Sequence, residues 1–176
     1  MTIVYFDSSA FVKLVVEEDG SEVAATLWDG CDAAVSSRLA YPEVRAALAA
    51  AGRAHHLDPA EQGRAEVLWE DFWAATRTVE LTETITAHAG HLASRHALRG
   101  ADAVHLASLL AVGAAETLFA VWDQKIVRAA RPDLLAGSGV MTTRSGSSSA
   151  SLAQAGWMLC LAMYSPRSLQ SAVTAS

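Results

Sequence analysis

Cysteine, basic residues and long apolar runs are all scarce in this sequence, and each shortage excludes a class of protein. Only two cysteines occur among 176 residues, Cys31 and Cys160, far apart and at no metal-ligand spacing. They exclude a disulfide-rich scaffold and a cysteine-based zinc site, and we expect both to be free thiols in a reducing cytoplasm. The net charge of −6 lacks the basic excess that usually marks nucleic-acid-binding proteins.

No apolar run approaches the ~20 residues of a membrane span. The N-terminus has no basic segment, and Lys13 and the acids at 17–19 interrupt its apolar stretch. We therefore expect neither membrane insertion nor a signal peptide. The composition that is present, 52% hydrophobic and 18% charged residues, is typical of a chain that folds into one domain.

The C-terminal part differs in composition from the rest. Residues 138–176 hold two arginines and no acid, so the preceding residues carry 19 acids against 11 bases. The Ser/Thr/Gly-rich stretch 142–151 is typical of a flexible linker, and the apolar segment 152–164 follows it. We therefore divide the chain into a folded domain at 1–141 and a tail at 142–176. Part of the acidic excess in the domain would be explained by carboxylates gathered at a metal site.

Hydrophobic patterns predict strands that alternate with helices. The expected strands are 2–7, 33–36, 78–81, 117–122 and an edge strand at 139–141, and the expected helices are 8–16, 21–28, 37–52, 58–75, 82–98, 101–110 and 124–130. Such alternation predicts a three-layer α/β fold, with a mainly parallel central sheet flanked by helices.

Residues at the expected helix starts predict how these helices are capped. Ser8 or Ser9 is expected to cap the first helix. Asp58 and Glu61 have the spacing of a capping box. Pro42 lies inside the third helical pattern, so the regular helix either begins near it or has a distorted first turn.

Four acids are placed to meet at one edge of such a sheet. Asp7 and Asp123 end expected strands, Asp102 lies in the first turn of a helix, and Glu43 lies near the start of another. Strand carboxyl ends and the helix starts that follow them share one edge of a parallel sheet. Like charges at ~4 Å repel by roughly 4 kcal/mol at an effective dielectric of 20, so such a cluster needs protons or a cation. Oxygen-only ligands suit Mg²⁺ or Mn²⁺, which serve displacement at phosphorus.

Each of these acids also has a simpler explanation. Asp7 and Asp123 can cap the helices that follow them, and the helix dipole favours Glu43 and Asp102 in first turns. His105 lies three residues after Asp102 on the same helix face, where it either packs in the core or orients the acids. The residues alone leave these alternatives open.

Four segments resemble the motifs of PIN-domain ribonucleases, in particular the VapC-type toxins of bacterial toxin–antitoxin pairs. They are residues 4–10, 36–45, 99–107 and 121–123. The motifs occur in the family's order, and the resemblance covers residues 2–141. The sequence departs from the pattern at Val121, where the family often has Thr or Ser, and after Met141, where the family pattern has no counterpart.

The resemblance implies a PIN-like fold and a Mg²⁺- or Mn²⁺-dependent cytoplasmic endoribonuclease, the toxin of a type II toxin–antitoxin system. Its partners would be an RNA substrate and a small antitoxin protein. The acidic, metal-holding site would consist of Asp7, Glu43, Asp102 and Asp123.

Other polar residues near these acids in sequence have candidate roles of their own. Ser8, Ser9 and His105 would orient the acids or a water. Four basic residues would meet RNA phosphates. They are Arg38, Arg45, Arg99 and Lys125.

Apolar side chains suggest association. The helix at 8–16 is apolar over more than one face, and the helix at 58–75 carries Trp69, Phe72 and Trp73. A single domain buries only part of this surface, so we expect a homodimer and a groove for an apolar antitoxin segment.

Three other functions remain open. A PIN-like scaffold would bind a partner without catalysis, and a related nuclease would process RNA without being a toxin. A phosphatase with Asp7 as nucleophile commonly needs an Asp two residues on, and Ser9 stands there.

Overall fold

The structure, a computed structural model, describes residues 1–113, 117–123 and 125–130. The expected edge strand at 139–141, the boundary at 141 and the tail at 142–176 lie outside the described residues. Within the described part, no helix is both long and apolar enough to cross a bilayer.

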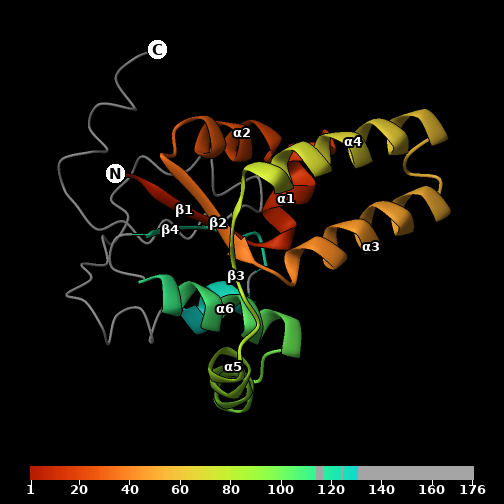
Figure 1. The fold of residues 1–176 in the computed structure, drawn as a ribbon. Coiled ribbons are helices and arrows are strands. Elements are labelled where there is room, and N and C mark those ends of the chain that lie inside the picture. The colour runs from red at the N-terminus through yellow and green to blue at the C-terminus, as the bar shows by residue number, and fades with distance from the viewer. Residues whose placement is uncertain (114–116, 124, 131–176) are drawn as a thin grey trace, which may run out of the picture.

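Four strands form one sheet in the order β3-β2-β1-β4, and every pairing is parallel (Figure 1). The strands are β1 (Ile3–Phe6), β2 (Ala33–Ser37), β3 (Arg77–Val79) and β4 (Thr117–Ala120). This confirms the predicted parallel sheet. From β1 the chain adds β2 and then β3 on one side, and it returns to add β4 on the other. The carboxyl ends of β1 and β4 therefore form the switch point at which open α/β sheets bind ligands.

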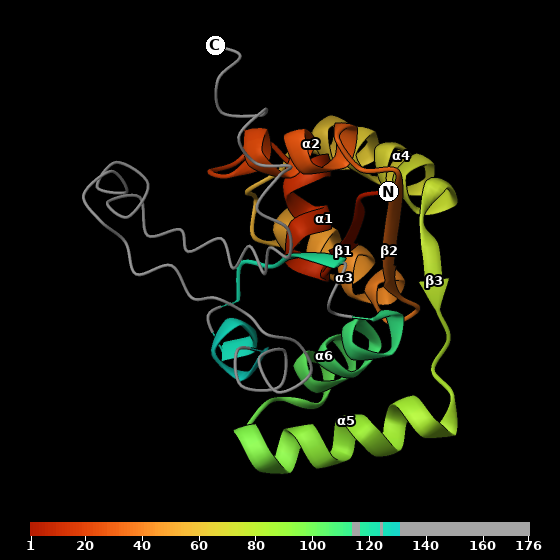
Figure 2. The same ribbon diagram turned by 90° about the vertical axis from the view of Figure 1, so that its left-hand side faces the viewer.

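Helices lie on both faces of the sheet, which confirms the three-layer architecture (Figures 1 and 2). One face carries α1 (Ser8–Val15), α2 (Ser21–Asp29), α3 (Ala40–Arg53) and α4 (Pro59–Ala75), and the other carries α5 (Glu83–His96) and α6 (Gly100–Val112). Residues 125–130 are also helical. Figure 1 shows α3 and α4 side by side, projecting beyond the sheet.

Alternate side chains of β1 enter two separate hydrophobic cores. Val4 and Phe6 pack with residues of α1, α3 and α4, whereas Tyr5 packs with residues of α5 and α6. Trp69 of α4 is fully buried in the first core, with its ring centroid 5.0 Å from that of Phe11. Replacing such a side chain with alanine costs about 3–5 kcal/mol, so Trp69 is a main anchor of α4.

The helix starts agree with the sequence at α4 and differ at α1. The predicted capping box is present: Glu61 N donates to Asp58 Oδ1 and Asp58 N donates to Glu61 Oε2, each at 2.8 Å. At α1 the cap is Asp7, whose side chain accepts from Ala10 N, while Ser8 is already the first helical residue. The prediction of a serine cap is therefore wrong, because the Asp7 carboxylate reaches the third helical amide first.

Two further boundaries test the prediction: the third helix starts near Pro42, as one of the two expected alternatives had it, and the strand predicted at 117–122 is shorter than expected. The third helix begins at Ala40, so Pro42 lies in its first turn, where the missing N–H of proline is tolerated. The strand predicted at 117–122 ends at Ala120, two residues early. Asp123 therefore lies three residues past β4 instead of directly at its end.

Candidate active site

Asp7 is a buried carboxylate at the carboxyl end of β1. It is 3% exposed, and its Oδ1 accepts hydrogen bonds from Ser9 Oγ at 2.6 Å and from Ala10 N at 2.9 Å. Burial raises the pKa of Asp7 from 3.8 to about 6, although these hydrogen bonds oppose the rise. Ionising this carboxylate at neutral pH therefore costs free energy that a nearby cation would offset.

Ser9 links this carboxylate to the segment that follows β4. Its hydroxyl donates to Asp7 and accepts from the backbone N–H of Trp122 at 3.1 Å. Trp122 immediately precedes Asp123. Ser9 therefore ties Asp7 to the backbone of the segment that carries Asp123.

Glu43 of α3 belongs to a second hydrogen-bonded group. Its Oε2 lies 2.7 Å from His105 Nε2 and also accepts a hydrogen bond from Ser8 Oγ. On the other side of the imidazole, Tyr5 Oη lies 3.1 Å from Nδ1. Burial pushes the pKa of Glu43 upward, but the hydrogen bonds from His105 and Ser8 outweigh it and lower the pKa below its ordinary value. Glu43 is therefore held as a carboxylate.

Asp102 contributes an oxygen without a hydrogen bond. Its Oδ2 is buried and has no hydrogen-bond partner among the described residues. Burial, then the negative charges of Asp123 and Glu43, raise the pKa of Asp102. Asp123 itself accepts a hydrogen bond from Lys125 N at 2.7 Å. A buried, unpaired carboxylate oxygen beside other acids is the arrangement that a cation stabilises.

The four predicted acids thus lie near one another, but the described side chains do not form a closed metal cage. The charge of Glu43 acts on both Asp7 and Asp102, which places the acids at one edge of the sheet. Among the described residues, no three His, Cys, Asp or Glu side chains are placed to hold a metal ion. Mg²⁺ commonly takes only one or two carboxylates and completes its shell with water. The oxygen-only donors fit such a water-rich site.

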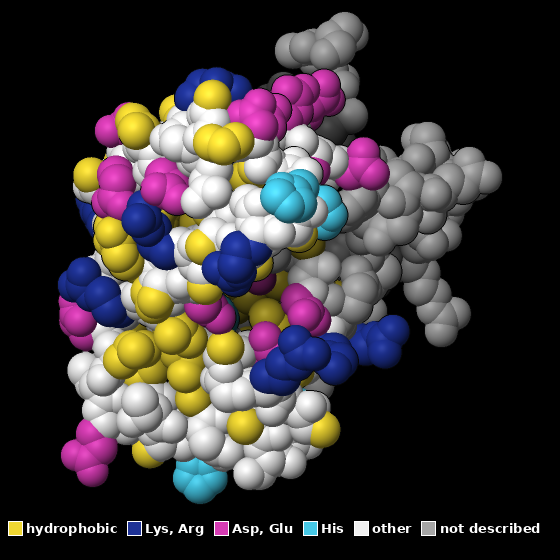
Figure 3. Space-filling model, turned by 90° about the vertical axis from the view of Figure 1, so that its right-hand side faces the viewer, with side chains coloured by type: hydrophobic (Ala, Val, Ile, Leu, Met, Phe, Trp, Pro, Cys, Tyr) yellow, Lys and Arg dark blue, Asp and Glu magenta, His cyan; other side chains and the backbone are white. Residues whose placement is uncertain are grey.

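One face of the molecule is hollowed. Figure 3 shows acidic side chains in and around this hollow, with Lys and Arg side chains at its margins. A cleft lined by acids and bordered by bases suits a bound cation together with an anionic ligand.

The sequence profile of the PIN domain family matches residues 4–131 of the chain. The chain belongs to this family. Its PIN domain is 68% identical over 126 residues to the proteins named Ribonuclease VapC45 and Ribonuclease VapC49 of two Mycobacterium tuberculosis strains, CDC 1551 and H37Rv. The alignments cover 72% of this chain and 88% of each relative. The PIN domain is therefore of the VapC type.

One solved structure is also similar to the PIN domain. It is titled a toxin–antitoxin complex from Klebsiella pneumoniae, at 16% identity and a TM-score of 0.49. The match covers 69% of this chain and 88% of that one.

The four predicted RNA-binding residues of the PIN domain have different surroundings. The charge of Arg99 acts on Asp102, and Lys125 is exposed two residues beyond Asp123. Arg38 instead forms an ion pair with Glu80. Arg45 lies 3.5 Å from Glu66 and 3.7 Å from Glu70. Contact of these four residues with RNA remains a prediction, and the structure brings two of them near the acids.

Two residues that shape this site were missed by the sequence analysis. Tyr5 binds His105 across 100 positions, and Trp122 binds Ser9 across 113. Tyr5 carried a signal, because a tyrosine in a buried strand usually needs a partner for its hydroxyl. Trp122 carried none, since its backbone N–H makes the contact.

Proposed function

We propose that this chain is a divalent-metal-dependent endoribonuclease that acts as the toxin of a type II toxin–antitoxin pair. The observation that carries the proposal is its 68% identity over 126 residues to two proteins named ribonucleases. The acidic edge supports it, because Asp7 and Asp102 hold carboxylate oxygens in surroundings that raise the pKa of both. Oxygen donors without nearby thiolates favour Mg²⁺ or Mn²⁺.

Each acid has a distinct role in this proposal. Asp7 and Asp102 would hold the ion, with Asp123 beside them. When bound, the ion would polarise a phosphodiester and lower the pKa of a water molecule. Glu43 is kept ionised by the hydrogen bonds from His105 and Ser8, and would add a fixed negative charge beside the ion. Departure of the 3′ oxygen would leave 5′-phosphate and 3′-hydroxyl ends.

Val121, where the sequence departs from the family pattern, is a core residue. Val121 is fully buried within the core that α5 and α6 share with the sheet. Its side chain therefore supplies no hydroxyl to Asp123. Ser9 provides the hydroxyl that contacts this segment, through Trp122 N.

The antitoxin and a second copy of the chain remain the proposed partners, in the cytoplasm, but their expected surface changes. Phe11 is fully buried and Val15 is 8% exposed, so α1 uses its apolar residues in the core. Apart from Met1 at the N-terminus, the exposed large apolar side chains among the described residues are Val67 (65%), Leu68 (44%) and Leu81 (41%). We therefore assign partner binding to the exposed face of α4 that carries Val67 and Leu68.

A scaffold without catalysis is the second candidate, since no three described acidic, Cys or His side chains are placed to hold a metal. A phosphatase is less well supported. Ser9, where such an enzyme commonly needs a second Asp, is already bound to Asp7 Oδ1 and Trp122 N.

The deciding experiment is cleavage of total cellular RNA by the purified chain with Mg²⁺ or Mn²⁺. We expect cleavage that EDTA stops and that Asp7→Asn abolishes. Asp58→Asn is the matched control, because Asp58 also caps a helix but is exposed and distant in sequence from the acids. Cleavage equal in Asp7→Asn and wild type would contradict the proposed site.

The toxin role needs a separate test in cells. Expression of the chain alone should stop growth, and co-expression of the neighbouring small open reading frame should restore it and co-purify. A nuclease that is active in vitro but harmless in cells would instead support a non-toxin role in RNA processing.

A further inference from the structure

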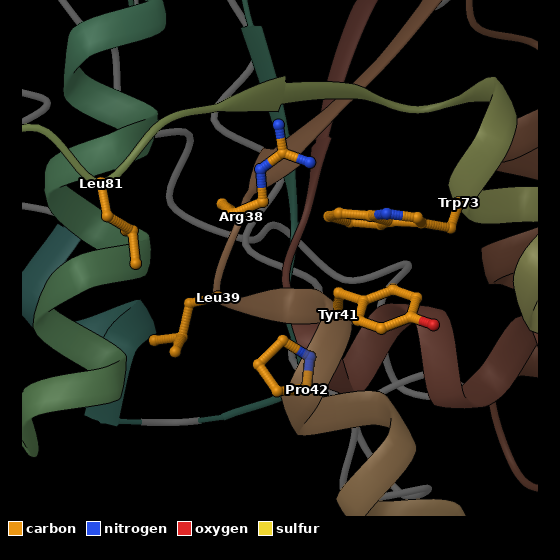
Figure 4. A pocket seen from close by; sticks show the side chains of 6 residues that line it. All are labelled: Arg38, Leu39, Tyr41, Pro42, Trp73 and Leu81. Carbon is orange, nitrogen blue, oxygen red and sulfur yellow. The ribbon is translucent and has the colours of Figure 1, made fainter.

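An apolar pocket opens near the carboxyl ends of β2 and β3, on the side of the sheet away from β4 (Figure 4). Its volume is about 410 Å³, within the range of small-molecule sites. We call it the Trp73 pocket, and it is lined by Arg38, Leu39, Tyr41, Pro42, Trp73 and Leu81. These residues come from the segments that follow β2 and β3, from the first turn of α3 and from the end of α4.

Two aromatic rings form one wall of the pocket. The ring centroids of Tyr41 and Trp73 are 5.5 Å apart, at an interplanar angle of 48°. Behind them lies the buried Trp69, 5.3 Å from Trp73. The Tyr41 hydroxyl donates to Glu70 at 2.9 Å, which fixes the ring. The wall is thus held in place before any ligand arrives.

Aliphatic and cationic groups complete the pocket. Figure 4 shows Leu39 and Leu81 across from the two rings, and the Arg38 guanidinium near the Trp73 ring. Arg38 pairs with Glu80, and both side chains are at least half exposed. Exposed ion pairs of this kind are weak, so Arg38 can exchange its partner for a phosphate.

The pocket lies on the same edge of the sheet as the acids. Tyr41 and Pro42 directly precede Glu43 in the first turn of α3, and Arg38 N donates to Val79 O between the ends of β2 and β3. Strands are spaced ~4.8 Å apart, so the ends of β2 and β3 lie roughly 5–10 Å from that of β1. Figure 3 shows hydrophobic side chains gathered beside the acidic hollow, on the same face.

We infer that the Trp73 pocket receives one unstacked base of a single-stranded RNA whose backbone crosses the acids. The inference rests on the proposed ribonuclease function and names how that site holds its substrate. Every base has a π face that can stack on an aromatic ring, and the leucines cover the opposite side. A planar, uncharged base also avoids repulsion from Glu70 and Glu80, which a phosphate in the same place would meet.

The test separates base binding from backbone binding. The probes are a 12-nucleotide oligoadenylate and a 12-residue ribose-phosphate chain without bases, both fluorescently labelled. Binding is measured by anisotropy with the full chain carrying Asp7→Asn, so that nothing is cleaved. We expect oligoadenylate to bind about tenfold more tightly than the abasic chain, as stacking of one base typically provides. Equal affinities would overturn the inference.

Substitutions locate the base. Trp73→Leu should remove most of the tenfold difference and leave the affinity for the abasic chain unchanged. Leu81→Glu should do the same, and Leu68→Glu is its matched control. Both leucines are similarly exposed, at 41% and 44%, but only Leu81 lines the pocket. Since both changes add one negative charge, equal losses would indicate general repulsion and overturn the inference.

Three outcomes separate the base pocket from the proposed ribonuclease function. If the wild-type protein cleaves RNA but Trp73→Leu and Leu81→Glu leave the affinities for both probes unchanged, the proposed base pocket is wrong. The proposed ribonuclease function is then retained. If these variants instead convert a dimer into a monomer without changing the preference for oligoadenylate, a second copy covers the pocket. If neither probe binds and no RNA is cut, both proposals fail.

Discussion

His105 Nε2 lies 2.7 Å from Glu43 Oε2, although 62 positions separate the two residues in sequence. The contact joins the first turn of α3 to the first two turns of α6 above the switch point of the sheet. A carboxylate only accepts hydrogen bonds, so Nε2 is the donor. His105 therefore stabilises Glu43 as a carboxylate and fixes its position among the acids.

The first prediction removes this contact. His105→Phe keeps a buried ring but removes the hydrogen bonds that His105 makes with Glu43 and with the Tyr5 hydroxyl, which should cost about 1–3 kcal/mol of unfolding free energy. Because the hydrogen bond lowers the pKa of Glu43, its loss should also move the acid limb of RNA cleavage to higher pH. Urea denaturation and cleavage rates between pH 4 and 8 measure the two effects.

His88 provides the control for this change. It is exposed on α5, so His88→Ala should alter stability by less than about 0.5 kcal/mol and leave the pH profile unchanged. Tyr5→Phe separates the two ends of the contact, since it removes the bond to Nδ1 of His105 and leaves the bond between Nε2 and Glu43 in place. A pH profile that is the same for His105→Phe and wild type would show that His105 merely packs.

The second prediction concerns the pH dependence of stability through Asp7. Burial places its folded pKa at about 6, against an ordinary value of 3.8. Between these values the folded state binds more protons than the unfolded state, so this group makes stability fall as pH rises. The penalty is absent below pH ~4 and complete above pH ~6, and amounts to at most about 3 kcal/mol at 1.36 kcal/mol per unit.

Asp7→Asn should therefore stabilise the metal-free protein at pH 7 and flatten its stability curve between pH 4 and 6. Asparagine still caps α1, because its side-chain oxygen can accept from Ala10 N. Asp58→Asn tests the cap alone, since Asp58 is exposed, and should bring no such gain. Chemical denaturation in EDTA at several pH values gives the comparison. A loss of stability in Asp7→Asn at pH 7 would mean that the charged form is favoured in the fold.

The third prediction concerns the metal. An ion that binds only the folded state at ten times its dissociation constant adds about 1.4 kcal/mol of stability. For a domain of this size, we expect the melting temperature to rise by about 3–6 °C with Mg²⁺ or Mn²⁺. Asp102→Asn should remove most of this rise, because its Oδ2 is the buried oxygen without a described hydrogen-bond partner. Equal rises in Asp102→Asn and wild type would place the ion elsewhere.

Much of this fold was predictable because the spacing of apolar residues along the sequence differs between strands and helices. The parallel sheet, the capping box at Asp58 and the placement of Asp7 after a buried strand all follow from neighbouring residues. The cap of α1 did not, since Asp7, Ser8 and Ser9 are three adjacent residues that can each cap a helix. Which of the three residues caps the helix depends on backbone angles that cannot be read from the sequence.

The candidate site was predictable as a set of residues and not as a set of contacts. The acids could be grouped because strand ends and helix starts share an edge. The bond between Tyr5 and His105, 100 positions apart, depends on how α6 packs over β1. Nor did the sequence show that α1 would bury Phe11 and Val15 and leave the exposed apolar residues to α4 and the segment after β3.

The fourth prediction uses two glycines with opposite surroundings. Gly20 has φ +91°, and a Cβ placed there would lie 2.9 Å from Trp122 Nε1 and 3.3 Å from Lys13 Cδ. Gly63 lies inside α4, and nothing comes within 4 Å of a Cβ at that position. Gly20→Ala should therefore destabilise the protein by about 1–3 kcal/mol through backbone strain, and Gly63→Ala should stabilise it by about 0.5–1 kcal/mol.

The same pair tests whether Trp122 positions the acids. Gly20→Ala pushes on the indole of Trp122, whose backbone N–H holds Ser9 next to Asp7 and whose neighbour is Asp123. We therefore expect RNA cleavage to fall severalfold in Gly20→Ala, measured at a temperature where the variant is fully folded by circular dichroism. Gly63→Ala should cleave at the wild-type rate. A folded Gly20→Ala protein with wild-type activity would show that the segment around Trp122 does not position Asp7 or Asp123.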